Sequence, residues 1–338
     1  MRCVYFLMTI DTEADNGWAR EKELTTKNAK FLPRFQELCE SYGFKPTYLT
    51  TYEMALDPFF QEFGRDVITR RQGEIGAHLH AWSSPPLVPL TDADYRFLPY
   101  ITEYPDYLVR QKTAYLTSVL EETFQVDMVS HRGGRWGFNA VSARALVENG
   151  YRVDCSVFPH MSLRRNPGAP AGNGGPDFTS FPNRPYFVDL DDISRPGDSC
   201  LLEVPLTVRR SKSVFNNAIH AVLDRLYPMY KVLRRFSLNI HALMPNGHNL
   251  DSMLWLVKEA VAEGCDCVEF MLHSSELMPG GSSHFADKRS IDALYENLEG
   301  LFAVAKMLCD GATLAEYFQH VSAGEMQVLL PNSEQRQL

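Results

Sequence analysis

Short apolar runs alternate with amphipathic stretches along the chain, and this alternation predicts strands separated by helices. The first run, CVYFLMTI at 3–10, is apolar throughout, as expected of a strand buried on both faces. A helix is predicted at about 26–42, where Phe31 and Phe35 recur at helical spacing before Gly43. The pattern is typical of an α/β fold with a largely parallel sheet. Further strands are predicted at 46–53, 74–80, 129–134, 152–157, 201–207 and 265–273, and further helices at about 57–70, 104–124, 139–150, 214–236, 249–263, 287–308 and 312–321.

One stretch breaks the alternation. Residues 158–200 contain many Gly and Pro residues, as in NPGAPAGNGGP, and show no helical period. We expect a long loop insertion there, with a hairpin at its end, and a loop of this length is usually functional or mobile. The seven or so strand–helix units favour a distorted (β/α) barrel over an open sheet, although periodicity alone does not decide between them. We therefore expect one barrel domain over 1–325, interrupted at 158–200, and a C-terminal tail at 326–338.

Composition narrows the class of protein. The chain has 338 residues, with 33 Lys+Arg against 42 Asp+Glu and a net charge of −9, which argues against a general binder of nucleic acid or anionic membranes. No apolar stretch is long enough for a transmembrane segment, and the seven scattered cysteines do not suggest a disulfide framework. The opening residues, MRCVYFLMTIDTE, lack the basic run and cleavage site of a signal peptide. We expect a soluble, cytoplasmic enzyme, and its oligomeric state is left open.

Ionisable residues follow four of the predicted strands. In a parallel α/β fold the carboxyl ends of the strands share one rim, and chemistry collects there. Chance could place one or two such residues at that rim, but not this many. They are Asp11, Glu13, His78, His80, His131, Arg132 and His273.

The spacing within two of these pairs predicts a metal site. Asp11 and Glu13 are two residues apart, as are His78 and His80, so each pair points to one face of its strand. Two imidazoles and a carboxylate are a standard ligand set for Zn²⁺ or a similar divalent ion, with a position left open for water. A lone His-x-His is often an accident of surface or core. The acidic residues at the same rim favour the metal.

Other polar and aromatic residues near the rim are candidates for catalysis or substrate binding. His273 suits either a ligand or a proton donor at neutral pH. Arg132 lies in HRGGRWG, where glycines let the backbone approach a ligand, although an ordinary ion pair would also explain it. Trp82, Trp136 and Arg135 are candidates for binding substrate, with ordinary packing as the alternative for each tryptophan.

Three further histidines are harder to place. His241, His248 and His284 fall in loop-like segments that could line the site, and nothing in the sequence positions them.

In their order along the chain, these motifs resemble those of the NodB-type polysaccharide deacetylases, carbohydrate esterase family 4. The resemblance covers roughly 3–321 outside 158–200. Five ordered matches are a specific signal, although each alone is weak. TIDTE at 9–13 is similar to the family's Thr-Phe-Asp-Asp motif, GEIGAH at 73–78 to the approach to its His-x-x-x-His motif, HRGGRWG at 131–137 to its Arg motif, GYRVDCS at 150–156 to the segment that follows, and MLHSSELMPGG at 271–281 to its final Leu-His motif.

The resemblance implies a distorted (β/α) barrel with fewer than eight full units. It also implies metal-dependent hydrolysis of an N-acetyl group from a sugar. By position, Asp11 is the implied general base, His273 the general acid, Arg132 the residue that holds the base, and His78 the first metal histidine.

The chain departs from the family pattern at two positions. Thr12 stands where the family has a metal-binding Asp, and Trp82 stands where it has the second metal His. Glu13 and His80, each on the correct strand face, would supply the missing ligands. Asp11 could then be a ligand as well, which leaves the identity of the base open.

The expected substrate is an acetamido sugar, and the expected cofactor is a divalent metal, Zn²⁺ above others. Because no export signal is visible, we expect a nucleotide-linked, lipid-linked or small intracellular glycan precursor rather than an extracellular polymer. Two alternatives remain. One is another C–N or glycosidic hydrolase on the same barrel, and the other is a non-catalytic carbohydrate-binding protein that has lost the metal.

Overall fold

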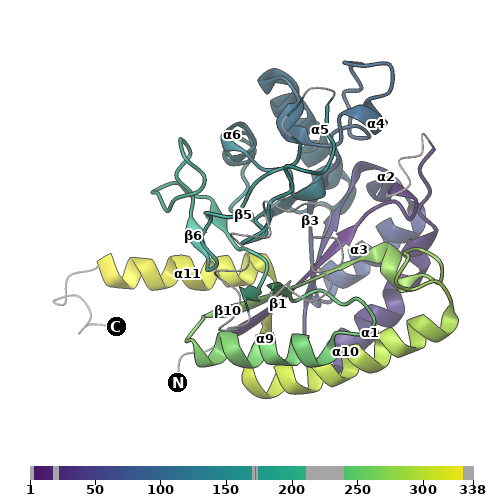
Figure 1. Cartoon of the computed structure of the whole chain (residues 1–338), viewed down its shortest axis with the longest axis vertical. Coiled ribbons are helices and arrows are strands. Elements are labelled where there is room, and N and C mark those ends of the chain that lie inside the picture. Colours follow the sequence, from purple (N-terminus) through teal and green to yellow (C-terminus); the bar gives the residue numbers. More distant parts are fainter. Residues whose placement is uncertain (1–3, 18–22, 170–171, 173, 211–239, 330–338) are drawn as a thin grey trace, which may run out of the picture.

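The computed structural model describes residues 4–17, 23–169, 172, 174–210 and 240–329. Its centre is a nine-stranded sheet in the order β10-β1-β2-β3-β4-β5-β7-β6, with β11 also paired to β1 (Figure 1). Every pairing in this sheet is parallel except that of β6 with β7. The strands are β1 (Tyr5–Thr12), β2 (Pro46–Thr50), β3 (Glu74–Leu79), β4 (Ser130–Gly133), β5 (Val153–Asp154), β6 (Tyr186–Phe187), β7 (Leu202–Glu203), β10 (Cys267–His273) and β11 (Asp310–Ala312).

The helices form a layer outside the sheet. Apolar positions on the outer side of the strands, such as Phe6, Ile10 and Phe270, pack with this layer into the largest core cluster. The helices are α1 (Leu32–Tyr42), α2 (Tyr52–Ala55), α3 (Pro58–Thr69), α4 (Asp94–Phe97), α5 (Asp106–Phe124), α6 (Ala140–Glu148), α9 (Leu250–Ala262), α10 (Lys288–Leu308) and α11 (Leu314–Leu329), with short 3-10 turns at Lys27–Phe31, Ile101–Glu103, Gly134–Trp136 and Ser274–Leu277.

The sheet curves into a barrel that irregular segments complete. Beyond β7, the Leu206 amide donates to the carbonyl of Val157, and the Thr207 amide donates to the carbonyl of Glu269 on β10. The chain then forms a separate antiparallel pair, β8 (Val208–Arg210) with β9 (Ile240–Ala242). The prediction of a distorted (β/α) barrel is therefore confirmed, and the distortion lies where ladder pairing gives way to single hydrogen bonds.

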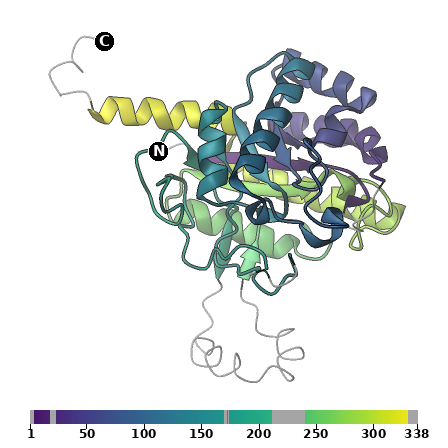
Figure 2. The same cartoon turned by 90° about the horizontal axis from the view of Figure 1, so that it is seen from above.

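The first turn of α11 closes the amino ends of the strands. Leu314 and Tyr317 pack with the inner-face residues Leu7 and Leu49 in a second apolar cluster. The amide of Ala315 donates to the half-buried Glu74 carboxylate at 3.0 Å. Both views show the rest of α11 projecting from the barrel (Figures 1 and 2).

Several predicted boundaries are corrected. The strand predicted at 46–53 ends at Thr50, because the chain turns at once into α2. The strand predicted at 201–207 is reduced to β7, since the residues after it make only isolated hydrogen bonds. The last predicted helix, at 312–321, begins two residues later than predicted, at Leu314, because Ala312 ends β11, which pairs with β1.

The end of the loop insertion does form a hairpin, from β6 to β7, in which the Val188 amide donates to the carbonyl of Leu201. Helix α11 continues into the predicted tail. The helix predicted at 214–236 and residues 330–338 lie outside the described residues.

The described cysteines are all free thiols. In the part of the chain that the structure describes, each helix is too short or too polar to cross a bilayer.

Candidate active site

Residues from opposite ends of the chain meet at the carboxyl ends of the strands. Thr9 and Asp11 of β1, and Glu13 directly after it, point to the inner face, since side chains alternate along an extended chain. Parallel pairing places His273 of β10 directly beside Asp11. The fold thus unites the first and last motifs of the sequence at one rim, as the strand-end rule predicts.

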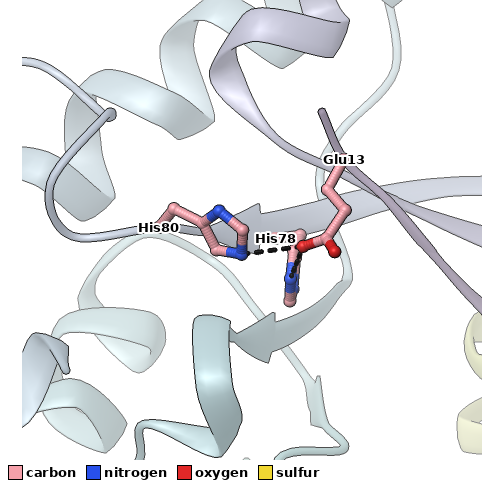
Figure 3. Close-up of side chains that lie close together, drawn as sticks. All are labelled: Glu13, His78 and His80. Carbon is pink, nitrogen blue, oxygen red and sulfur yellow. Dashed lines mark ion pairs between the residues drawn. The ribbon is translucent and has the colours of Figure 1, made fainter. Parts of the chain in front are cut away.

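Glu13, His78 and His80 form a buried cluster whose ligand atoms lie within 4.8 Å of one another (Figure 3). Nε2 of His78 lies 3.4 Å from Oε2 of Glu13, and Nε2 of His80 lies 2.9 Å from the same oxygen. Ligand atoms arranged tetrahedrally around Zn²⁺ are about 3.3 Å apart, given bond lengths of about 2.0–2.1 Å. The donor set and its spacing therefore fit a divalent cation.

The charges in this cluster favour an ionised carboxylate. Burial raises the pKa of Glu13, but the neighbouring imidazoles of His80 and His78 outweigh burial and hold that pKa well below its ordinary value. Burial lowers the pKa of His78, and the carboxylates of Asp11 and Glu13 more than reverse this effect. Glu13 is an anion, as a metal ligand must be.

Asp11 has one oxygen engaged and one directed at the pocket. Nη1 of Arg132 donates to Oδ1 at 2.6 Å. Oδ2 lies 3.7 Å from Nε2 of His78 and 3.9 Å from Nε2 of His273. Burial raises the pKa of Asp11, but the positive charges of Arg132, His78 and His273 outweigh it and keep that pKa below its ordinary value. The free oxygen therefore belongs to an ionised carboxylate that can accept a proton.

Arg132 lies fully buried beneath the pocket between two acidic residues. Besides Asp11, its Nη2 donates to Oε1 of Glu269 at 2.8 Å and to the hydroxyl of Thr9 at 2.8 Å. Its Nε donates to the carbonyl of Cys155 at 2.9 Å. Glu269 was not identified from the sequence. The sequence feature that could have revealed it is a single acidic residue at an inward-pointing position of the apolar strand CVEFMLH.

Glu276 holds His273 and was also missed. Its Oε2 accepts the His273 backbone amide at 2.9 Å and lies 3.2 Å from Nδ1 of the ring. Burial lowers the pKa of His273, but this bond, the charge of Glu276 and the charges of Glu13 and Asp11 raise it to about 9. His273 therefore carries a proton at neutral pH.

A small pocket of about 20 Å³ brings most of the predicted site residues together. The ring of Trp82 stacks on that of His80 at 4.4 Å, and the Arg135 guanidinium lies 5.7 Å from the centre of the Trp82 ring. Trp136 lies with its ring centre 5.2 Å from the guanidinium of Arg132. The lining consists of Asp11, Glu13, Gly17, His78, His80, Trp82, Arg135, Trp136 and His273.

His131 does not reach this pocket. Its side chain points to the opposite face of β4 from Arg132, where its Nδ1 lies 2.7 Å from Oδ1 of the buried Asp154. A second cavity, of about 1220 Å³, adjoins the pocket and shares His273 with it. His241, His248 and His284 line this larger cavity.

Solved structures of other proteins share this fold. No protein-family model matches the chain, and no curated protein matches its sequence. A solved structure of a candidate polysaccharide deacetylase from Mycobacterium smegmatis is 14% identical, with a TM-score of 0.52, over 98% of this chain and 93% of that one. A candidate glycoside hydrolase/deacetylase from Parabacteroides distasonis is 11% identical, with a TM-score of 0.57, over 94% of this chain and 71% of that one.

The fold is accordingly a distorted (β/α) barrel of the α/β class. Within that class it is the NodB-type polysaccharide deacetylase fold, as the sequence motifs implied.

Proposed function

We propose that the protein is a metal-dependent hydrolase that removes an N-acetyl group from an acetamido sugar. One observation supports this above all. The free oxygen of Asp11 and Nε2 of His273 face each other at 3.9 Å beside the Glu13–His78–His80 cluster. A proton acceptor and a proton donor thus lie beside a site for a Lewis acid. Amide hydrolysis needs these three groups together.

Glu13, His78 and His80 would hold the cation, and Zn²⁺ suits this set of two nitrogen ligands and one oxygen ligand. When bound, a divalent cation polarises the amide carbonyl and acidifies a water molecule. Trp82 stacks on one of these ligands, and Trp136 and Arg135 complete the wall against which a sugar would rest.

Protons move through two side chains. Asp11 Oδ2 accepts the proton of the attacking water, while Arg132 holds the other oxygen and keeps the carboxylate ionised. His273 Nε2 donates a proton to the departing nitrogen, which turns a poor leaving group into an amine. Glu276 keeps His273 protonated until that step.

The larger cavity offers room for the rest of the substrate beyond the acetamido group. Asp15 and Asp251 line it, and their carboxylates would repel a diphosphate, whereas Glu276 is paired with the protonated His273. Among nucleotide-linked, lipid-linked and small glycan substrates, this lining favours an uncharged glycan.

Metal content and product identity test the proposal. Purified protein should bind one divalent ion and release acetate from an N-acetylated oligosaccharide. Glu13→Gln should lose both properties, whereas Glu23→Gln, on the exposed surface nearby, should keep them. New reducing ends without acetate would indicate a glycosidase, which ordinarily uses two carboxylates about the scissile bond. Wild-type protein that binds no metal would indicate a non-catalytic carbohydrate-binding protein.

A further inference from the structure

The two histidines of the metal cluster are held in different ways. The Nδ1 of His78 donates to the carbonyl of Arg132 at 3.0 Å, which directs Nε2 at Glu13. Histidines that bind metals usually have such a bond from the second nitrogen, because it fixes the tautomer and the ring orientation. The Nδ1 of His80 is buried and has no hydrogen-bond partner among the described residues. Something other than a hydrogen bond from its second nitrogen must therefore orient His80 when Nε2 binds a metal.

Packing on two sides of the ring can do so. Trp82 covers one face of His80, with ring centres 4.4 Å apart and planes inclined by only 23°. Gly134 abuts the ring edge, since a Cβ built on Gly134 would overlap Cδ2 of His80 and lie 3.1 Å from its Nε2. The imidazole thus has a flat aromatic surface on one side and main chain on another.

The main chain that carries Gly134 is itself fixed. A tight turn follows β4, in which the Gly137 amide donates to the carbonyl of Gly134 at 3.0 Å. The Gly133 amide donates to the hydroxyl of Ser156 at 2.8 Å, and that hydroxyl donates to the buried Asp154 at 3.0 Å. Because β5 and the segment after it anchor the turn, Gly134 is a firm surface rather than a yielding one.

We propose that Trp82 and Gly134 are positioning residues that orient His80 for metal binding by packing, in place of a hydrogen bond to its second ring nitrogen. The proposal rests on the proposed metal site, but it changes the role expected of Trp82, which would serve the ligand rather than stack on a sugar. Position 82 needs a flat aromatic ring to stack on His80, and position 134 needs a residue without a side chain to leave room for the His80 ring. The φ angle of Gly134 lies outside the left-handed region, so an alanine there is opposed by contacts with His80 and with the carbonyl of Leu79 rather than by its own backbone conformation.

Metal affinity tests this directly, because it does not depend on turnover. Apo-protein would be titrated with Zn²⁺ against a chromophoric chelator, and the visible spectrum of the Co²⁺ form would report the ligand set. We expect Trp82→Leu and Gly134→Ala each to weaken Zn²⁺ binding about 10–100-fold and to change the Co²⁺ spectrum, as changes around metal ligands typically do. Trp82→Phe should remain within a few-fold of wild type, because it keeps a flat ring on His80.

Trp255→Leu is the matched control. This tryptophan also packs against a histidine, since the ring centres of Trp255 and His241 are 5.1 Å apart. Neither residue belongs to the Glu13–His78–His80 cluster. Its variant should bind Zn²⁺ like wild type. If Trp82→Leu keeps wild-type affinity and only raises KM, Trp82 is a sugar-stacking residue and the proposal is wrong.

The remaining outcomes are also decisive. Should Trp82→Leu fail to fold, unchanged Zn²⁺ affinity in Gly134→Ala would overturn the proposal by itself. Wild-type protein without Zn²⁺ affinity would instead refute the proposed function, so the two failures are distinguishable.

Discussion

The two ends of β1 bury the same face of one strand in opposite kinds of surroundings. At the amino end, Leu7 lies in an apolar cluster with Leu49 and Leu314. At the carboxyl end, Asp11 and Glu13 lie among imidazoles and a guanidinium, equally shielded from solvent. In this barrel, the position of a residue along the strand, and not its burial, distinguishes the apolar packing cluster from the cluster of charged residues.

The difference shows which end can contribute stability. Removing apolar surface from water is favourable at the amino end, where α11 closes the barrel. At the carboxyl end, each buried charge costs desolvation energy, which Arg132 offsets for Asp11 and the imidazoles of His78 and His80 offset for Glu13. The apolar end thus stabilises a fold whose other end carries the proposed active site.

The largest expected effect is on turnover, at the charged end. His273→Ala should lower turnover by about two to four orders of magnitude, the usual contribution of a general acid, and leave metal content intact. Steady-state kinetics and metal analysis would measure both. His320→Ala, on the exposed surface of α11, is the control and should match wild type. If His273→Ala loses the metal, then His273 is a ligand and its role as an acid is wrong.

The next effect is on stability, at the apolar end. Leu7→Ala should reduce the free energy of unfolding by about 2–5 kcal/mol, because it opens a cavity in a closed cluster. Turnover should stay at the wild-type value below the melting transition. Leu7→Met, which conserves volume, should cost less than about 1.5 kcal/mol. A fall in turnover that accompanies the loss of stability in denaturant titrations would show that the two ends of β1 are not independent.

The smallest effect is a shift in pH dependence. Turnover should fall as pH rises through the pKa of His273, about 9 in the metal-free chain, because the acid must carry its proton. Glu276→Gln removes a charge that raises this pKa, so the alkaline limb should move to lower pH by about one unit. Glu299→Gln, at an exposed position of α10, should leave the limb in place. An unmoved limb in Glu276→Gln profiles would remove Glu276 from the mechanism.

Strand periodicity was sufficient to predict that each of the two pairs of ionisable residues at the pocket shares one face. Because Asp11 and Glu13, and likewise His78 and His80, are two apart at strand ends, both pairs had to share a face. The same rule separates His131 from Arg132, since adjacent strand residues point to opposite faces. His131 lies near the end of its strand, as predicted, but its side chain points away from the pocket.

The partners of these residues were less visible in the sequence. Glu269 is hidden in an apolar run, and its contact with Arg132 depends on which distant strands curve together. The completion of the barrel after β7 rests on isolated hydrogen bonds, which have no periodic signature. The local sequence pattern predicted to which face each side chain points. Which residues from distant strands it contacts depends on the three-dimensional fold.

The pairing of β1 with β10 has a consequence for synthesis of the chain. At about 5–20 residues per second, β10 emerges roughly 15–50 s after β1. During that interval β1 has an unpaired edge, and an apolar strand with such an edge is prone to pair with other nascent chains. Charges that point inward are one of the devices that protect strand edges. Asp11 and Glu13, to which the proposed function assigns catalysis and metal binding, would thus also protect the unfinished barrel against aggregation on the ribosome.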